Sequence, residues 1–303
     1  MNMKNSEKKS ENISGTISEM ISRVVENKVI APDISDIFEM ELHAPELSGC
    51  KPGQFVMVYL DKGEHLLPRP ISICRYENES KSVFLVYKKV GAGTEYMTTL
   101  KPGAFLRLMG PLGNGYAIKN SYVIKSEESK ADMKIALVGG GVGIPPLVQL
   151  YKELKLSGLE SADIFLGFRD KPFLTEHFAG ANLYTTTGNL IDLVKQHESD
   201  HKPNHESDHK SNHESDHKSN HESDHKQGRN YSEIYACGPK PMLAALAQYA
   251  KEKGITLQVS LEERMACGIG VCLGCVAPTA DHPPGYLKIC CDGPVFYSDK
   301  VDL

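Results

Sequence analysis

The sequence predicts a β-barrel, then an α/β domain with a doubly wound parallel sheet, then a small cysteine-rich C-terminal subdomain. Short apolar runs between Pro-Gly turns fill the first third of the 303 residues. Apolar runs that alternate with helical stretches follow, as in a parallel sheet. Five of the eight cysteines lie after residue 260. We therefore predict a tail at residues 1–20, a barrel at 21–120, the α/β domain at 130–260 and the subdomain at 261–303.

The composition excludes several classes of protein. The net charge is −5, so there is no positive field for nucleic acid. No apolar run approaches the roughly 18 residues of a membrane helix. The polar N-terminus lacks the apolar segment of a signal peptide, and the cysteine spacing does not suggest a disulfide framework. We expect a cytoplasmic protein with a flexible N-terminal tail.

The barrel strands are predicted from three apolar runs and the turns around them. The runs are Gln54–Leu60, Ile71–Tyr76 and Val83–Val90. Pro-Gly and Gly-Pro turns near residues 52, 102 and 110 separate such segments. Short strands at this spacing are typical of a small barrel.

Two segments of the barrel indicate a flavin site. Arg69-Pro70-Ile71-Ser72 lies where a strand is expected, and an arginine there can pair with a pyrophosphate. Gly93-Thr94 follows the strand end at Tyr87-Lys88 and opens a helical segment, whose free N–H groups suit a phosphate. An edge strand with an ordinary surface arginine is the alternative for the first segment. Together the segments favour a bound flavin.

The α/β domain is predicted from its alternating pattern. Lys134–Val138 is a buried strand, and a helix follows from Ile144 to Leu154 with prolines in its first turn. The remaining predicted elements are strands at 163–168, 182–186, 234–236 and 255–260 and a helix at 239–251.

Two motifs at strand ends suggest a nucleotide site in this domain. The first strand ends in a glycine run, Gly139, Gly140, Gly141 and Gly143, which precedes a helix as a dinucleotide site requires. Residue 144 is isoleucine, so the run is not a true G-x-G-x-x-G, and a tight turn is the alternative. Cys237-Gly-Pro follows a later strand at the sheet edge where ligands bind. A buried small hydrophobe is the alternative for Cys237.

An octapeptide repeat interrupts the α/β domain at residues 197–228. Four copies of HESDHK followed by two variable residues contain eight of the twelve histidines and almost no apolar residues. Such a segment cannot bury enough surface to offset the entropy of ordering it. We predict a disordered surface insertion, with weak metal capture by the histidines as the alternative.

The cysteine motif near the C-terminus carries the most specific chemistry. Cys267, Cys272 and Cys275 have C-x4-C-x2-C spacing, which plant-type ferredoxins use for a [2Fe–2S] cluster. A structural zinc site and free thiols are the alternatives, although zinc sites usually have two C-x2-C pairs. The fourth ligand is Cys290 or Cys291, and spacing alone does not choose between these neighbours.

Taken in order, these motifs resemble the ferredoxin reductase superfamily over residues 21–196 and 229–300. Glu263-Arg-Met-Ala-Cys267 and Cys290-x-Asp-Gly-Pro-Val-Phe narrow the resemblance to the electron transfer subunits of dihydroorotate dehydrogenase B. By matching position, the resemblance implies that the cluster ligands are Cys267, Cys272, Cys275 and Cys290. It implies that the FAD contacts are Arg69, Pro70, Ile71, Ser72, Val86, Tyr87, Lys88, Gly93 and Thr94.

The resemblance also implies a function in pyrimidine biosynthesis. Electrons from dihydroorotate would pass from the FMN of a catalytic partner subunit, through [2Fe–2S] and FAD, to NAD⁺ as substrate. The expected assembly is a heterotetramer with two copies of each subunit. The base for dihydroorotate oxidation would belong to the partner, and Cys237 would lie near the nicotinamide.

Three departures from the family pattern stand out. The histidine repeat is foreign to it, Thr185–Asn189 lacks an expected acidic pair, and Cys291 follows the fourth ligand. The choice between NAD and NADP stays open.

The alternative family comprises subunits of NAD(P)H–ferredoxin oxidoreductase or sulfide dehydrogenase. In that family an aspartate occupies the position of the first cluster ligand, whereas here the residue is Cys267. A metal-storage protein defined by the repeat would leave the other motifs unexplained.

Overall fold

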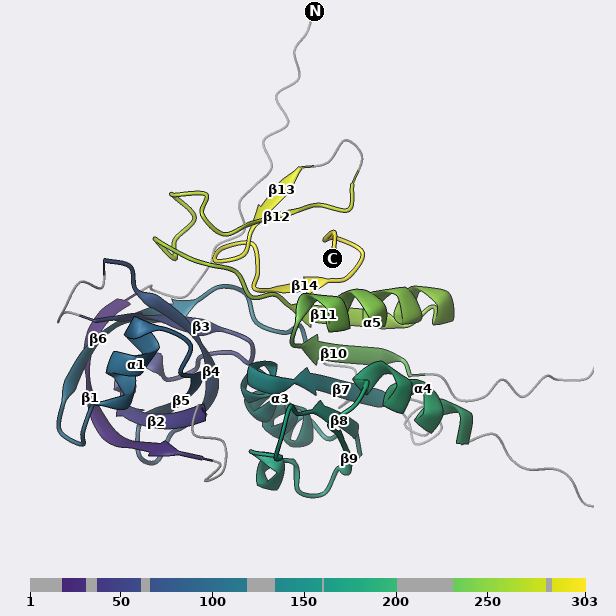
Figure 1. Cartoon of the computed structure of the whole chain (residues 1–303), viewed down its shortest axis with the longest axis horizontal. Coiled ribbons are helices and arrows are strands. Elements are labelled where there is room, and N and C mark those ends of the chain that lie inside the picture. The colour runs from purple at the N-terminus through teal and green to yellow at the C-terminus, as the bar shows by residue number, and fades with distance from the viewer. Residues whose placement is uncertain are drawn as a thin grey trace, which may run out of the picture.

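The computed structural model describes residues 18–30, 37–60, 66–118, 134–159, 161–200, 231–281 and 285–303. A barrel and an open sheet flanked by helices lie side by side, and the C-terminal segment lies against both (Figure 1). The predicted combination of a barrel with an α/β sheet is confirmed.

The barrel is closed and antiparallel. Its strands, in the order β1-β2-β5-β4-β3-β6, close because β6 pairs with β1. Alternate residues of β5 point to opposite sides: Val83, Leu85 and Tyr87 pack inside the barrel, whereas Phe84 and Val86 pack toward the α/β domain. The six strands are β1 (Ser18–Val29), β2 (Ile37–His43), β3 (Phe55–Tyr59), β4 (Arg69–Glu77), β5 (Ser82–Lys88) and β6 (Phe105–Leu112).

Two short helical segments accompany the barrel. A 3-10 turn, η1 (Pro45–Leu47), follows β2. Helix α1 (Ala92–Thr98) packs the fully buried Met97 into the barrel core, so it covers the barrel rather than lying free on its surface.

The open sheet has the order β14-β11-β10-β7-β8-β9. Five of its strands are parallel, and each begins or ends within a few residues of its predicted range. The antiparallel edge strand β14 was not predicted; it comes from the C-terminal subdomain and pairs with β11. The strands are β7 (Ile135–Gly140), β8 (Asp163–Gly167), β9 (Asn182–Thr186), β10 (Glu233–Cys237), β11 (Thr256–Ser260) and β14 (Val295–Tyr297).

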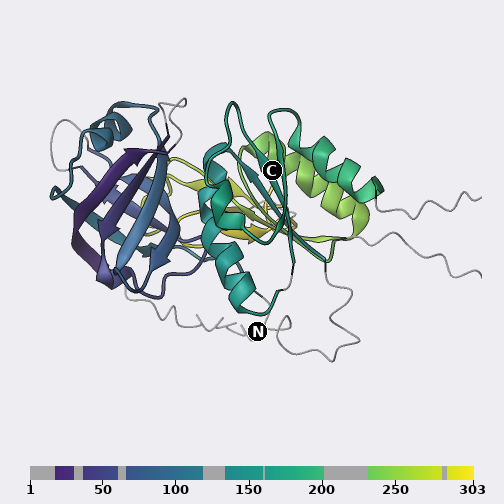
Figure 2. The same cartoon turned by 90° about the horizontal axis from the view of Figure 1, so that it is seen from below.

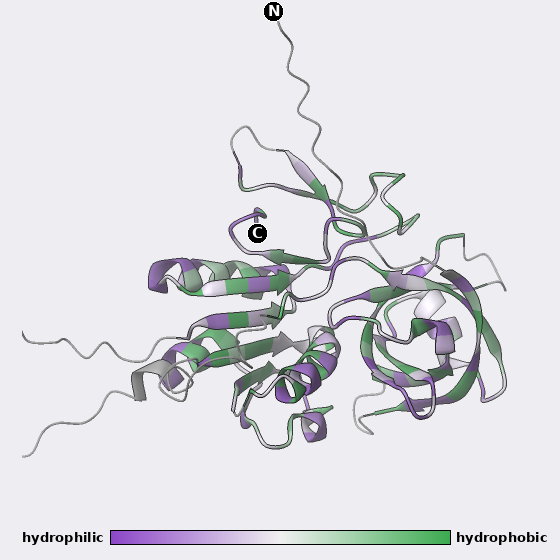
Figure 3. Cartoon of the chain, turned by 180° about the vertical axis from the view of Figure 1, so that it is seen from behind, coloured by the Kyte–Doolittle hydropathy of each residue, from purple (hydrophilic) through white to green (hydrophobic). Residues whose placement is uncertain are grey.

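Helices cover both faces of this sheet (Figure 2). Helix α3 (Pro145–Leu156) packs with the strand side chains of one face, and its first turn carries the two prolines that suit a helix start. Helices α4 (Leu190–Asp200) and α5 (Lys240–Lys253) pack on the other face. Hydrophobic stretches follow the central strands, whereas the helices are mixed in character (Figure 3). The two 3-10 segments are η3 (Gly141–Gly143) and η4 (Thr175–Phe178).

The C-terminal subdomain contains a hairpin and the cysteine-bearing segments. Strands β12 (Val276–Pro278) and β13 (Tyr286–Lys288) pair antiparallel. Its buried side chains, among them Cys275 and Ile289, belong to the same hydrophobic core as Met57 and Leu112 of the barrel. The subdomain is therefore packed against the barrel as well as against the sheet.

Buried hydrogen bonds hold the barrel on the α/β domain. The Gln149 amide of α3 donates to the carbonyl of Cys50 at 2.9 Å, and the Tyr116 hydroxyl donates to the carbonyl of Ala236 at 3.0 Å. Gln258 of β11 exchanges two hydrogen bonds with the backbone of Ala117, both 2.9 Å long. Because these groups are largely removed from water, the bonds give the junction a defined geometry.

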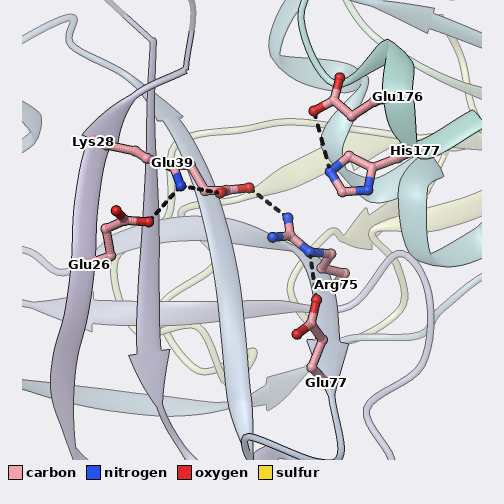
Figure 4. A network of polar contacts seen from close by, with 7 residues as sticks. All are labelled: Glu26, Lys28, Glu39, Arg75, Glu77, Glu176 and His177. Carbon is pink, nitrogen blue, oxygen red and sulfur yellow. Dashed lines mark hydrogen bonds and ion pairs between the residues drawn. The ribbon is translucent and has the colours of Figure 1, made fainter.

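A polar network lies on the barrel face that looks toward η4 (Figure 4). The guanidinium of Arg75 is 2.6 Å from a carboxylate oxygen of Glu39 and 3.3 Å from one of Glu77. It also lies over the ring of Phe84, 3.5 Å from the centroid. Lys28 lies at the exposed edge of the network, 4.0 Å from Glu39.

The histidine repeat begins inside an ordered helix, so the prediction of disorder was wrong for residues 197–200. Helix α4 extends to Asp200. His197, the first histidine of the repeat, is 2.5 Å from the Tyr184 hydroxyl and packs edge-on against Phe165. Aromatic contacts formed in the folded domain hold this residue, which local composition cannot reveal. Residues 201–228 of the repeat lie outside the described residues.

Two further expectations concern the N-terminus and membranes. Strand β1 begins at Ser18, within the range predicted as a tail, and residues 1–17 lie outside the described residues. None of the helices in the described ranges is long and apolar enough to span a membrane.

Candidate functional site

Four cysteines of the C-terminal subdomain lie as two pairs. The thiol of Cys267 interacts with that of Cys272, and the thiol of Cys290 interacts with those of Cys275 and Cys291. Cys275 and Cys290 are buried, whereas Cys272 is exposed. The loop after β11 and the turn after β13 therefore carry these cysteines as one buried pair and one pair with an exposed member, and their assignment as cluster ligands stays a prediction.

Backbone N–H groups of the loop point at the sulfur atoms. The N–H groups of Ile269 and Cys272 lie 3.5 and 3.4 Å from Sγ of Cys267, and that of Gly270 lies 3.2 Å from Sγ of Cys290. Burial opposes ionisation of Cys267, but the N–H groups of Cys272 and Ile269 outweigh it and lower the thiol pKa to about 7. The loop therefore favours the thiolate form of Cys267.

Left-handed backbone conformations turn those N–H groups inward. Gly268 and Gly270 have φ values of 71° and 77°, and Leu273 has 55°. Glycine adopts this region at little cost, whereas leucine does not. The backbone of Leu273 is therefore locally strained in this loop conformation.

The cysteine motif suits an iron–sulfur cluster better than a single zinc ion. Zinc sites usually have two C-x2-C pairs, whereas only Cys272 and Cys275 have that spacing here. A two-iron cluster takes two thiolates at each iron, and the N–H groups directed at the sulfurs of Cys267 and Cys290 fit such a group. Among the residues that the structure describes, no three Cys, His, Asp or Glu side chains are placed to hold one metal ion, so the ligand set rests on the motif.

The cysteine loop lies directly against the barrel. A Cβ on Gly268 would lie 2.7 Å from the side chain of Met57 in β3 and 3.3 Å from Leu112 in β6. The Asn114 side chain, just beyond β6, donates to the carbonyl oxygens of Cys291 and Asp292. A cluster on this loop would therefore be held at a fixed position relative to the barrel.

On the barrel, the structure brings Arg69 to the start of helix α1, so the two segments predicted to contact a flavin lie together. The guanidinium lies over Gly93, where a Cβ would come within 2.4 Å of its central carbon. The guanidinium also donates to the carbonyl of Leu67. A cation and the N-terminal turn of α1 thus meet at one place, which suits a pyrophosphate.

The Thr94 hydroxyl forms hydrogen bonds within its own turn. It accepts from the N–H groups of Val90 and Gly91 and donates to the carbonyl of Gly91. Its hydroxyl therefore shapes the turn, and any phosphate contact at this residue would come from the backbone.

The other predicted FAD contacts divide between two sides of the barrel wall. Ile71 packs against the interior, and Tyr87 is buried there, stacked on Phe38 and donating to Asn27 at 3.0 Å. Val86 packs outward toward the α/β domain, and Lys88 lines the large cavity described below. Pro70 and Ser72 are half-buried on β4. The structure therefore does not gather all nine side chains on one surface.

A cavity of about 870 Å³ opens at the carboxyl ends of β7, β8 and β10, between the sheet and the barrel. This is the edge at which ligands bind in doubly wound sheets. The lining includes Gly140, Gly141 and Gly143 of the predicted glycine run, with Lys88, Arg169 and Lys171 as its cations. Gly141 has a φ of 55° and open space where a side chain would be.

The glycine run is needed for packing as well as for the cavity. A Cβ on Gly143 would lie 2.4 Å from the carbonyl oxygen of Cys237, and one on Gly139 would lie 2.9 Å from Leu147. The turn therefore passes close to β10 only because these residues lack side chains.

Cys237 is fully buried beside the cavity and is not part of its lining. Burial raises the pKa of its thiol well above the ordinary value, and the nearby Glu262 carboxylate raises it further. Cys237 is therefore a neutral thiol in the core. That Cys237 lies beside the nicotinamide stays a prediction.

Sequence reasoning missed three contributors. Glu262 and Met242 line the cavity, and Asn114 holds the cysteine turn. Glu262 follows the last parallel strand by two residues, which is the only local signal. Asn114 and Cys291 are 177 positions apart, so nothing in the local sequence indicates their contact.

Comparisons with known proteins agree with this geometry. A family model described as an oxidoreductase FAD-binding domain matches residues 22–116. A model described as the iron–sulfur cluster binding domain of dihydroorotate dehydrogenase B matches residues 262–302. The electron transfer subunit of dihydroorotate dehydrogenase B (NAD(+)) from Geobacillus sp. (strain WCH70) is 34% identical over 284 residues, covering 92% of this chain and 97% of that protein.

The chain belongs to the dihydroorotate dehydrogenase B electron transfer subunit family. A relative of the same name from Bacillus cereus (strain G9842) is 35% identical over 286 residues, with 92% and 97% covered. Membership makes the chain a subunit of an oxidoreductase, with FAD and an iron–sulfur cluster as its cofactors. The resemblance inferred from the motifs is confirmed.

Solved structures support the fold of this dihydroorotate dehydrogenase B family member. The NADH-dependent reduced ferredoxin–NADP oxidoreductase, described for flavin-based electron bifurcation, is 26% identical with a TM-score of 0.71, covering 93% of this chain and 89% of that chain. Ferredoxin–NADP⁺ reductase from Plasmodium falciparum is 13% identical with a TM-score of 0.56, covering 80% and 96%, and shows the fold alone.

Proposed function

We propose that this chain carries electrons from a dihydroorotate-oxidising partner to NAD⁺ within a pyrimidine-synthesising enzyme. The observation that carries the proposal is the order of three sites in space. The cysteine loop contacts the barrel at Met57, and the barrel and the sheet share the large cavity. When bound, FAD would supply the exchange between single electrons and a hydride that links an iron–sulfur cluster to NAD⁺.

Named residues would hold each group. Cys267, Cys272, Cys275 and Cys290 would ligate the cluster. Arg69 and the backbone at Gly93 and Thr94 would hold the FAD pyrophosphate, with Pro70, Ile71, Ser72, Val86, Tyr87 and Lys88 as the remaining contacts. Gly140, Gly141 and Gly143 would face the NAD⁺ phosphates, with Arg169 and Lys171 nearby, as the cavity lining supports.

The partner is proposed to be the FMN-containing catalytic subunit, in a heterotetramer with two copies of each chain. It would dock on the exposed side of the cysteine loop. Three apolar side chains there are exposed, Ile269 by 44%, Val271 by 76% and Leu273 by 49%. They flank the exposed Cys272, and an electron must enter close to the cluster. An apolar patch at that place suits a permanent subunit contact.

The cytoplasm is the proposed location. All eight cysteines are free, and several of them are needed as thiolates for the cluster. A reducing compartment keeps such thiols available.

A paired assay tests the proposal. The chain is expressed with the candidate catalytic subunit, and NADH formation is measured after adding dihydroorotate and NAD⁺. We expect activity from the pair and none from either subunit alone. NADH formation by the catalytic subunit without this chain, or none from the assembled pair, would overturn the proposal.

A second candidate is supported by the 26% identity and TM-score of 0.71 with the ferredoxin–NADP oxidoreductase. In that case ferredoxin would replace dihydroorotate as the electron donor. The same purified pair, supplied with reduced ferredoxin and NAD(P)⁺, distinguishes the two: the dihydroorotate assignment predicts the faster reaction with dihydroorotate.

A further inference from the structure

Two neighbouring thiols lie on the same side of the turn after β13. The Sγ atoms of Cys290 and Cys291 are 3.7 Å apart. In extended backbone, successive side chains point to opposite sides. Here the N–H groups of Cys291 and Asp292 both donate to the carbonyl of Lys288, at 3.0 and 2.7 Å. The tight turn brings both thiols toward the cysteine loop.

The facing loop leaves room for both sulfurs at Gly270. Its N–H lies 3.2 Å from Sγ of Cys290. A Cβ at the same residue would lie 2.6 Å from Sγ of Cys291. Any larger residue would push Cys291 away, so the loop accommodates a fifth thiol beside the four proposed ligands.

The separation of the two sulfurs is that of two ligands on one metal centre. Thiolates bound tetrahedrally at about 2.3 Å lie roughly 3.8 Å apart. An iron held by Cys290 would therefore be within reach of Cys291 after a change of its side-chain rotamer. The two cysteines differ in burial: Cys290 is buried against Cys275, whereas Cys291 is half-exposed. Cys290 is thus the resident ligand.

We propose that Cys291 is a reserve ligand, which takes over the iron when its bond to Cys290 breaks. The exchange balances without a redox step. One iron–thiolate bond breaks and one forms, Cys291 releases a proton and Cys290 takes one up, and no electron moves. The inference rests on the proposed assignment of the four ligands.

Alanine variants of the full-length, flavin-bearing chain test the proposal, because alanine offers iron no oxygen ligand. Iron and acid-labile sulfide are measured per bound flavin after anaerobic purification, and electron paramagnetic resonance reports the ligand set. Cys290→Ala should keep iron within about twofold of the wild type, with a changed resonance spectrum. Cys275→Ala and the double variant C290A/C291A should hold about tenfold less iron.

The controls separate two kinds of failure. If Cys275→Ala and Cys290→Ala lose iron equally, the reserve ligand is wrong while the four-ligand site stands. If Cys275→Ala keeps wild-type iron, the proposed ligand assignment itself is wrong. Equal iron in Cys290→Ala and in the double variant also contradicts a role for Cys291.

A second measurement decides the matter if Cys290→Ala fails to fold with flavin. Cys291→Ala removes one half-exposed sulfur and leaves all four proposed ligands. An iron chelator is added to the oxidised protein, and loss of the cluster absorption is followed. We expect release several-fold faster than from the wild type, because a broken bond can no longer be replaced. An unchanged rate would overturn the proposal.

Discussion

The side-chain amide of Asn114 donates hydrogen bonds to the carbonyl oxygens of Cys291 and Asp292, both 3.1 Å long. Asn114 lies two residues beyond the last barrel strand, and Cys291 follows the proposed fourth ligand, Cys290. The end of the barrel therefore holds the turn that completes the cysteine site. This contact couples the flavin domain to the cluster loop through one side chain.

Replacing Asn114 by alanine tests that coupling. Asn114→Ala removes two hydrogen bonds but keeps the backbone bond from Asn114 to Gly293, so the fold should survive. We expect a loss of about 1–2 kcal/mol in the free energy of unfolding and faster release of iron to a chelator. Asn78→Ala, at an exposed hairpin position, is the control and should change neither. Unaltered iron release in Asn114→Ala would show that the contact does not steady the site.

Glycines 91 and 93 form a matched pair for testing the flavin site. A Cβ at Gly93 would overlap the Arg69 guanidinium, whereas a Cβ at Gly91 would meet nothing within 4 Å. Because the guanidinium is a flexible end group, Gly93→Ala should displace it without unfolding the barrel. The displaced charge no longer aligns with a pyrophosphate, so we expect FAD affinity to fall roughly tenfold to a hundredfold. Flavin retention through gel filtration measures this, with Gly91→Ala as the control; equal retention in the two variants would rule out the Arg69 assignment.

The Arg75–Glu39 pair on the barrel should be important for stability (Figure 4). The side chains are only 12% and 8% exposed. Arg75→Ala would leave the Glu39 carboxylate buried without its main partner, which costs about 3–5 kcal/mol of unfolding free energy. Lys28→Ala removes a 50% exposed cation from the same carboxylate and should cost below about 1 kcal/mol. Chemical denaturation measures both, and similar losses would contradict this account of the network.

Asp163 should make the α/β domain sensitive to acid. Burial alone would raise its pKa, but hydrogen bonds from Asn182, Tyr231 and Lys134 outweigh burial and lower it. A lowered pKa in the folded state means that the stabilisation is complete above the unfolded pKa of about 3.9 and is lost as the pH falls through the folded value.

The matching variant is Asp163→Asn, which keeps the shape and removes the charge. Its deficit in unfolding free energy relative to the wild type should be constant from pH 7 to about pH 5 and should shrink below about pH 4. Denaturant titrations at each pH measure the difference. Because the His197 ring lies 3.9 Å from the same carboxylate, Asp163→Asn is also compared with the wild type at pH 7 and 5.5. A deficit that grows on acidification would contradict the lowered pKa.

Local pattern was sufficient to predict most strands and helices of the fold. The buried strands at 163–168 and 182–186 are continuous or alternating apolar runs, and both are present within a residue of their predicted ends. Strand β14 was missed because it is three residues long and exists only by pairing with β11. His197 was misassigned because aromatic neighbours distant in sequence hold it in a helix.

The candidate site could be predicted where its chemistry is local. The cysteine spacing and the strand–glycine–helix context each lie within one short segment. The inward direction of Tyr87 could not be predicted, because it depends on which face of β5 closes the barrel. The Arg69–Gly93 approach and the Asn114–Cys291 contact join separate elements, so they require the folded chain.

The central claim is that one chain links a nicotinamide cavity to an iron–sulfur cluster through a flavin. The most direct measurement is an anaerobic titration of the purified chain, without its partner, with NADH. Visible absorption follows the flavin, and electron paramagnetic resonance follows the cluster. We predict about one FAD and two irons per chain, with NADH bleaching the flavin and producing the reduced-cluster signal. A chain that binds no flavin or iron, or a cluster that stays oxidised while the flavin is fully reduced, would contradict the claim.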